Sequence, residues 1–329
     1  MRILVGAFIA LMTLSPLYHA NESGEIINTA MGKVTVKSAK RVITLEHRYT
    51  EMALSLGIIP VGVADIKSYQ NYDGIDGKKL DTIENVGQRA APNLESIANL
   101  RPTLMIGANL RNAPVYPVLS SIAPTLLFNY IQMPNNQEQP LAEMFAEFKT
   151  VAKALGKKEQ AGKIMASYAR TVAEAKAEIN HLRQQGELLS DEVAVAQFLP
   201  GSPKLRLLTT DSVAIEVLNS IGLQAAWPVK GGPSTFGYRT VGIQTLSVLG
   251  QANVFYFNER ADDHYLESTL KSPIWLNLPF VKSGLTYRLN QQTWPWGGPV
   301  ALEKFIDEVV NDLKQKSQKK DREYAKNAA

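Results

Sequence analysis

The residues best suited to hold a ligand are aromatic and basic side chains beside predicted strands of the first half. Two tyrosines follow one strand, an arginine precedes a helix, and an asparagine and an arginine follow another strand: Tyr69, Tyr72, Arg89, Asn109 and Arg111. Arginine can donate two parallel hydrogen bonds to an electron-rich group, and aromatic rings pack against apolar surface. These types predict a site for a bulky ligand with a polar, electron-rich centre.

A second group of aromatic residues lies in Gly- and Pro-rich loops of the second half. Phe236 and Tyr238 flank a glycine, and Trp294 and Trp296 precede the last predicted helix. We expect these loops to be exposed, and exposed tryptophans usually belong to an interface or a pocket. Each aromatic residue alone could equally be a local loop anchor. Their occurrence in both halves favours a cleft between two lobes.

The sequence lacks the usual signatures of catalysis. It has no cysteine, which excludes thiol catalysis and zinc–thiolate sites, and no phosphate-binding loop or Gly-x-Ser-x-Gly elbow. His47, His181 and His264 do not have the spacing of metal ligands. His47 follows the first strand and could either contact ligand or simply begin a helix. We predict a binding protein that is not an enzyme, without a cofactor and without a metal ion held directly by its side chains.

Strands alternate with helices along the chain. In the first half, β-branched runs at 41–45, 59–63, 103–106 and 122–128 alternate with helical stretches at 49–56 and 92–100. The second half repeats this layout, with strands at 205–208 and 254–257 and helices at 211–221 and 243–249. The alternation predicts α/β lobes with largely parallel pairing, and the repetition predicts two similar lobes.

A different composition, rich in Ala, Lys and Glu, separates the two halves. Within it, apolar residues recur at spacings of three and four, as one stripe on a helix: Ile164, Tyr168, Val172, Ala175, Ile179 and Leu182. A helix over 158–183 would be about 39 Å long at ~1.5 Å per residue, enough to brace two lobes. A coiled-coil dimer is the alternative explanation of the stripe. We expect a monomer.

The first twenty residues have the layout of a cleavable secretory signal. A positive start precedes an apolar run at 3–14, a Ser-Pro break and Ala20. No later stretch is long and apolar enough to span a bilayer, so we expect a soluble protein in the periplasm. Of the formal net charge of +4, residues 311–329 contribute six Lys or Arg against three Asp or Glu. The basic pI therefore does not indicate nucleic-acid binding.

The predicted organisation has five parts. They are a signal peptide at 1–20, a first α/β lobe at 21–139, a linker helix region at 140–185, a second α/β lobe at 186–312 and a basic flexible tail at 313–329. The mature chain is long enough for two domains of ordinary size.

Four segments, at 40–46, 56–65, 86–95 and 272–281, resemble the periplasmic binding proteins of siderophore importers. The Trp-x-aromatic-Gly pattern at 294–297 is similar to the narrower hydroxamate (ferrichrome-type) group. The order and spacing of these segments, over nearly all the mature chain, carry the resemblance. It implies a class III periplasmic binding protein: two similar α/β lobes joined by a single long helix, with a shallow cleft and small hinge motion. It also implies that the protein is the substrate-binding component of an ABC importer.

The resemblance further implies which residues contact the ligand. Arg89, in a Val-Gly-x-Arg segment, would contact the iron–hydroxamate oxygens, and Tyr72, Phe236, Trp294 and Trp296 would line the cleft. A tyrosine that some members carry after the strand at 103–106 is absent here. Leu110 or Arg111 occupies that stretch, which favours a ligand that is more polar or more anionic than ferrichrome.

Delivery implies two partners, a ferric siderophore that brings its own iron(III) and an inner-membrane ABC permease. In the family, docking usually uses a carboxylate on each lobe. Glu95 occupies the first-lobe position, whereas Gln244 stands at the second. Other readings stay open: a binding protein for another iron chelate (catecholate, citrate-type or haem) or a corrinoid, a periplasmic siderophore-processing enzyme, and a scaffold that uses the aromatic loops as a protein interface.

Overall fold

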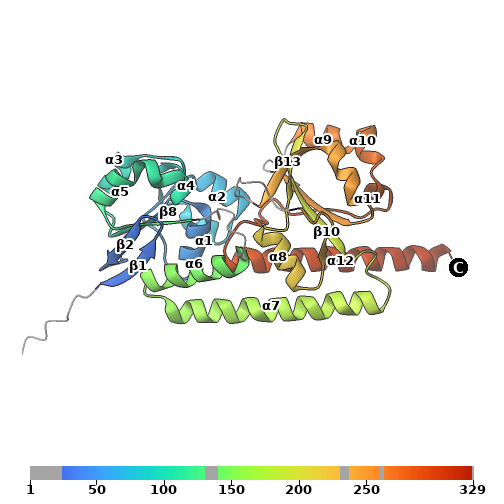
Figure 1. Cartoon of the computed structure of the whole chain (residues 1–329), viewed down its shortest axis with the longest axis horizontal. Helices are drawn as coiled ribbons and strands as arrows, with labels where there is room; N and C mark the ends of the chain where they lie inside the picture. Colours follow the sequence, from blue (N-terminus) through green and yellow to red (C-terminus); the bar gives the residue numbers. More distant parts are fainter. Residues whose placement is uncertain (1–23, 130–139, 230–236, 259–262, 328–329) are drawn as a thin grey trace, which may run out of the picture.

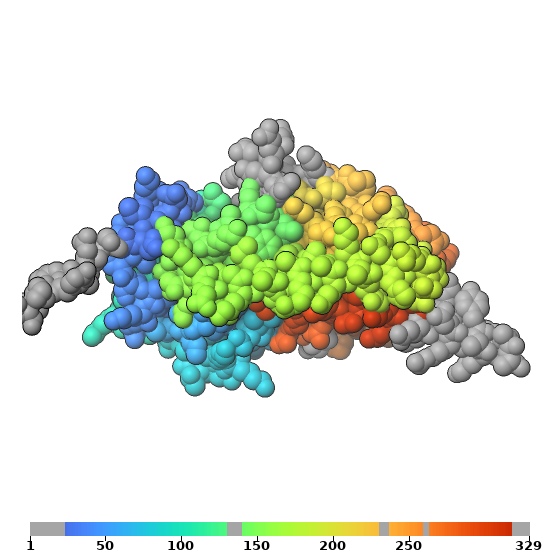
Figure 2. All heavy atoms as spheres, turned by 90° about the horizontal axis from the view of Figure 1, so that it is seen from below, coloured from blue at the N-terminus to red at the C-terminus, as the bar shows by residue number. Residues whose placement is uncertain are grey.

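Two α/β lobes stand side by side on a pair of long helices (Figure 1). This computed structural model describes residues 24–129, 140–229, 237–258 and 263–327, so the predicted signal at 1–20 lies outside the described residues. Helices α7 (Lys158–Gln184) and α12 (Pro299–Asn327) pack against each other beneath the lobes. Helix α7 runs along most of the face seen in Figure 2. The predicted pair of α/β lobes joined by a long helix is confirmed.

The first lobe is built on a five-stranded parallel sheet. Its strand order is β5 (Glu84–Asn85), β4 (Gly62–Val63), β3 (Val42–Thr44), β8 (Leu104–Ala108) and β9 (Thr125–Phe128). Thr44 pairs with both Val63 and Ile106, so the central strands reach their carboxyl ends at one level. Residues that follow these strands therefore meet at one edge of the sheet.

Short helices and two hairpins complete this lobe. The helices are α1 (His47–Ser55), α2 (Ile66–Tyr72), α3 (Leu94–Asn99), α4 (Asn109–Asn112), α5 (Tyr116–Ile122) and the 3-10 turns η1 (Gly77–Leu80) and η2 (Ala113–Val115). The hairpins pair β1 (Glu25–Thr29) with β2 (Gly32–Val36), and β6 (Gly87–Gln88) with β7 (Ala91–Pro92).

The second lobe has a mixed sheet, unlike the largely parallel one that the sequence predicted. Its order is β13 (Tyr238–Gly242), β11 (Lys204–Leu208), β10 (Glu192–Phe198), β14 (Asn253–Asn258) and β15 (Thr286–Arg288), with β12 (Gln224–Ala225) beside β10. Strand β11 runs antiparallel to both of its neighbours. The short connection at 199–203 leaves no room for the crossover that a parallel pair would need.

Five short helical segments surround this sheet: α8 (Val213–Ser220), η3 (Ile243–Leu249), α9 (His264–Leu270), α10 (Pro273–Leu276) and α11 (Pro279–Lys282). The predicted helix at 243–249 is thus present as a 3-10 helix.

The linker region contains α6 (Pro140–Ala154) as well as α7. Helix α6 packs on α1 and α8, so it contacts both lobes. The apolar stripe of α7 is buried in the same core as Phe305 of α12, and its buried members are Ile164, Tyr168, Ala175, Ile179 and Leu182. The stripe is thus covered within the chain, so it does not require a coiled-coil partner.

The stretch predicted as a flexible tail, 313–329, begins as an ordered part of α12. Leu313 and Ser317 are buried, Lys314 forms an ion pair with Glu178 at 3.0 Å, and the Ser317 hydroxyl donates to Glu187. The sequence shows that this stretch has an excess of basic residues. Only the fold shows that Glu178 and Glu187 lie beside it.

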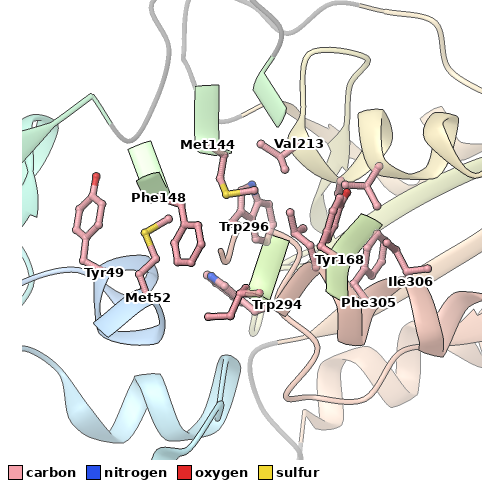
Figure 3. Close-up of a cluster of buried hydrophobic side chains, with 14 of the residues drawn as sticks. Tyr49, Met52, Met144, Phe148, Tyr168, Val213, Trp294, Trp296, Phe305 and Ile306 are labelled. Atoms are coloured by element: carbon pink, nitrogen blue, oxygen red, sulfur yellow. The ribbon is translucent and has the colours of Figure 1, made fainter. Parts of the chain in front are cut away.

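One hydrophobic core runs through both lobes. Figure 3 shows part of it, with Met52 and Phe148 on one side and Val213 and Phe305 on the other. A shared apolar core opposes separation of the lobes as rigid bodies, because separation would expose it. Within the described residues, no helix is both long enough and apolar enough to cross a bilayer.

Candidate functional site

A cluster of charged side chains lies at the carboxyl edge of the first-lobe sheet, where open α/β sheets bind ligands. Glu46 follows β3, Asp65 follows β4, and Arg111 lies in α4 directly after β8. Arg89 reaches the same edge from the turn of the β6–β7 hairpin. The Glu46 carboxylate accepts from Arg89 Nη1 at 2.8 Å and from Arg111 Nε at 2.6 Å. Arg89 Nε is also 3.6 Å from Asp65 Oδ2.

The buried carboxylate of Glu46 lies between Arg89 and Arg111 and pairs with both. We call these two arginines the Arg89–Arg111 pair. Glu46 is fully buried, whereas the side chains of Arg89 and Arg111 are 22% and 24% exposed. Burial alone would raise the pKa of the Glu46 carboxyl, but the two arginine charges outweigh it and lower that pKa to about 2. The carboxylate therefore stays ionised, and the exposed parts of both arginine side chains are what a ligand can reach.

Uncharged rings lie beside this pair. His47 is fully buried, with Nε2 4.0 Å from Asp65 Oδ2 and its ring centre 6.5 Å from that of Tyr72. Burial, with a further contribution from Arg89, lowers the pKa of His47 to about 4, so the ring is neutral at neutral pH. The Tyr69 hydroxyl donates to the carbonyl of Ile75, and its buried ring belongs to the core.

A row of aromatic rings links the two lobes. It passes through the aromatic loop, which we define as residues 290–298, between β15 and α12. The Trp294 ring stacks on Tyr72 of α2, with centres 5.5 Å apart and planes 16° apart. Trp296 contacts Trp294 at 5.0 Å and, in the second lobe, Phe257 at 5.7 Å and Tyr238 at 6.4 Å.

The prediction that these tryptophans are exposed is wrong. Trp294 and Trp296 are only 9% and 8% exposed, and they lie in the middle of the buried cluster in Figure 3. The rings fill the space between the lobes, which the sequence of the loop alone does not reveal. These small exposed fractions are what remains for contact with a ligand.

The second lobe adds a basic residue that the sequence analysis missed. The Arg206 guanidinium lies 4.8 Å over the ring of Tyr238 and donates to Gln197 Oε1 at 2.8 Å. The signal for it was a basic residue inside an otherwise apolar strand, 205–208. The predicted residue Phe236 lies outside the described residues.

The remaining predicted residues occupy different surroundings. Asn109 Nδ2 donates to Asn129 Oδ1 at 3.1 Å, so this amide ties the start of α4 to the end of β9. Glu95 is exposed in the first turn of α3, where the Asn93 side chain caps the helix. Gln244 is exposed at the start of η3. The structure thus brings Arg89, Arg111, Tyr72, Trp294, Trp296 and Tyr238 into one connected series and leaves Glu95 on the surface.

Sequence reasoning also missed the two acidic members of the cluster. Glu46 and Asp65 each follow a predicted strand closely, and that position was the available signal. Glu46 is separated from Arg89 by 43 residues and from Arg111 by 65. Only the fold shows that one carboxylate lies between both arginines. Guanidinium donors beside flat rings suit reversible binding of an electron-rich, partly apolar molecule.

Comparison with known proteins agrees with this architecture. The Fe(3+)-citrate-binding protein YfmC of Bacillus subtilis (strain 168) is 29% identical over 275 residues, which cover 83% of this chain and 81% of YfmC. The iron(3+)-hydroxamate-binding protein FhuD of Escherichia coli (strain K12) is 26% identical over 302 residues, covering 92% and 94%. The Fe3+–Desferal-bound siderophore binding protein FhuD from Vibrio cholerae has a TM-score of 0.71 at 29% identity, covering 84% of this chain and 98% of that chain.

A family model described as "Periplasmic binding protein" matches residues 42–293. The match begins with β3, ends within the aromatic loop, and includes Glu46, Asp65, Arg89 and Arg111. The two lobes and their long helix are the class III form of this fold. The chain belongs to the periplasmic binding protein family, and it is a binding protein, not an enzyme.

Proposed function

We propose that the protein captures a ferric siderophore in the periplasm and delivers it to the inner-membrane permease of an ABC importer. The Arg89–Arg111 pair, held by buried Glu46 beside the stacked rings of Tyr72 and Trp294, carries this proposal. A ferric chelate has electron-rich oxygens around the metal, to which guanidinium groups donate. Its organic periphery packs on aromatic rings. The iron arrives already chelated, so the protein supplies no metal ligand, and we expect it to act as a monomer.

The ligand class that we favour is a ferric hydroxamate. Two relatives support it by name, the hydroxamate-binding FhuD of E. coli and the Desferal-bound FhuD of V. cholerae. A ferric citrate-type chelate is the second candidate. It is favoured by the second guanidinium, Arg111, because a ligand with several carboxylates can accept hydrogen bonds from both arginines, and by the relative YfmC.

Titration with a panel of ferric ligands tests the proposal. Two of the four tryptophans lie in the row of rings, so we expect ferric desferrioxamine to quench the intrinsic fluorescence of the purified protein strongly. Iron-free desferrioxamine should quench less, and ferric citrate should bind more weakly. Equal quenching by the ferric and iron-free forms, or none with any ferric hydroxamate, would contradict the hydroxamate assignment. Tighter binding of ferric citrate would favour the second candidate.

Delivery can be separated from binding through Glu95. A carboxylate in the first turn of a helix is favoured by the helix dipole and need have no other role. If Glu95 instead faces an arginine of the permease, Glu95→Gln should leave siderophore affinity intact but slow uptake of radioactive iron by cells that depend on this protein. Gln244→Glu should leave uptake unchanged or increase it.

The control for that experiment is Glu159→Gln. Glu159 is an exposed carboxylate in the first turn of α7. In Figure 1, α7 lies below the lobes, whereas α3 lies at the top of the first lobe. Normal uptake with Glu95→Gln at limiting siderophore would remove Glu95 from the docking surface and leave it as a helix-start residue.

A further inference from the structure

The aromatic loop is fastened to the first lobe at two points along its length. Gln292 Nε2 donates to the backbone carbonyl of Gln70, in α2, at 2.8 Å. Arg48 Nε, from α1, donates to the carbonyl of Trp296 at 3.1 Å. Gln292 lies two residues before Trp294, and Trp296 itself belongs to the row of rings. Both contacts therefore hold the part of the loop that carries these rings.

A third attachment closes the loop at its end. Glu51, fully buried in α1, accepts a hydrogen bond from the Gly298 N–H and further ones from Val300 at 3.1 Å and Ala301 at 3.2 Å. The first N–H groups of a helix have no partner within it, and its dipole favours a carboxylate there. Glu51 therefore satisfies the start of α12 from the other end of the sequence.

Gly298 makes room for this carboxylate. A Cβ atom at position 298 would lie 2.7 Å from Glu51 Oε2 and 3.1 Å from Oε1. Any larger residue would require the Glu51 carboxylate or the loop to shift. The second glycine of the Trp-Pro-Trp-Gly-Gly sequence is therefore explained by the close approach of Glu51.

The contacts of the loop with the second lobe are of another kind. Trp296 meets Phe257 and Tyr238 edge-on, with ring centres 5.7 and 6.4 Å apart. Such contacts tolerate small displacements better than hydrogen bonds to a buried carboxylate do, because they depend less on direction. The loop is also hydrogen-bonded to α12, because Glu308 accepts from the Thr293 hydroxyl and Lys304 donates to the Gln292 carbonyl. At its Trp296 end, by contrast, hydrogen bonds come from α1 and ring contacts from the second lobe.

We propose that Glu51 is a positioning residue for ligand binding. Its carboxylate holds the aromatic loop against α1, which keeps the Trp294 ring stacked on Tyr72 beside the Arg89–Arg111 pair. The first lobe then carries both the guanidinium donors and the aromatic wall, although the wall comes from the far end of the sequence. This inference rests on the proposed function, because it concerns the same site.

The position of the loop can be measured without any ligand. Labelling with 5-fluorotryptophan gives one fluorine resonance for each of the four tryptophans, assigned by single Trp→Phe variants. Glu51→Gln keeps the size of the side chain but places an amide N–H2 against backbone donors. We expect it to shift the resonances of Trp294 and Trp296 and to leave those of Trp227 and Trp275 in place. Gly298→Ala, which displaces the loop from the other side, should give the same pattern.

Binding is then measured with ferric desferrioxamine. We expect Glu51→Gln and Gly298→Ala to bind it about tenfold more weakly, equivalent to about 1.4 kcal/mol. The matched control is Glu216→Gln. Glu216 accepts from the Leu141 N–H at 2.7 Å and so caps the start of a different helix, α6. The Glu216→Gln variant should have a lower melting temperature but unchanged affinity and unchanged Trp294 and Trp296 resonances.

The outcomes separate this inference from the proposed function. Unchanged Trp294 and Trp296 resonances in both loop variants would overturn the anchoring role of Glu51. Shifted resonances with wild-type affinity, or an equal loss of affinity in Glu216→Gln, would overturn its role in binding. If the wild-type protein binds no ferric chelate, the proposed function fails, and the fluorine spectra still decide whether Glu51 positions the loop. Should Glu51→Gln not fold, Gly298→Ala decides alone.

Discussion

Glu46→Gln should lower the free energy of unfolding at neutral pH by about 3 kcal/mol. The carboxylate is fully buried between Arg89 and Arg111, and its pKa falls from an ordinary 4.5 to about 2 in the folded protein. The ionised form is thus stabilised by folding. Its removal leaves two partly buried guanidinium groups without the carboxylate that they share. This loss destabilises the folded state relative to the unfolded state.

The same linkage gives the destabilisation a pH dependence. Because the folded-state pKa of Glu46 is depressed, its contribution is present above about pH 4.5 and is lost as the pH falls towards 2. The difference between wild type and Glu46→Gln in denaturant unfolding should therefore shrink over that window. The control is Glu25→Gln, because Glu25 pairs with Lys153 and Lys158 at the surface and should contribute little. An equal effect of the two substitutions at neutral pH would contradict the special role assigned to Glu46.

Arg89→Gln should weaken the binding of ferric desferrioxamine about tenfold or more. A charge-assisted hydrogen bond to a chelate oxygen contributes about 1.5–3 kcal/mol, and that contact would be lost. Arg111→Gln should act in the same direction if both guanidinium groups face the ligand. From the sequence alone, a ligand-contacting Arg89 would be expected to leave the melting temperature unchanged. The structure indicates otherwise, because Arg89 also neutralises buried Glu46.

A loss of stability must therefore be separated from a loss of binding. Arg183 is a suitable comparison, since it lies in the last turn of α7, pairs with Asp191 at 2.8 Å and donates to the carbonyl of Gly222. Arg183→Gln should lower the melting temperature and leave the affinity, measured by fluorescence titration, unchanged. If Arg89→Gln lowers the melting temperature with no change in affinity, Arg89 has a structural role only.

Local patterns in the sequence were sufficient for the architecture. Alternating β-branched runs and amphipathic stretches located β3, β8, β14 and α7, because strand and helix periodicities are local properties. The orientation of β11 and the ordered start of the 313–329 stretch were missed. Both depend on partners that are distant in the sequence or on a connection too short for a crossover.

The candidate site was predictable only as a set of residue types. Arg89 and the tryptophans were identifiable because such residues are unusual in loops. The burial of Trp294 and the buried Glu46 between two arginines were not, since each depends on segments many residues apart. A fully buried glutamate has no signature of its own, because glutamate is normally exposed.

The core that crosses both lobes also limits how such a protein can diversify. Neither half is a module with a surface of its own, because each would expose the apolar face that the other covers, together with the rings of the aromatic loop. Exchanging one lobe for that of a relative would require the new interface to repack around α6, α7 and α12 at the same time. Changes of ligand preference are therefore more accessible through single substitutions at the strand ends, such as positions 111 and 206, than through recombination of lobes.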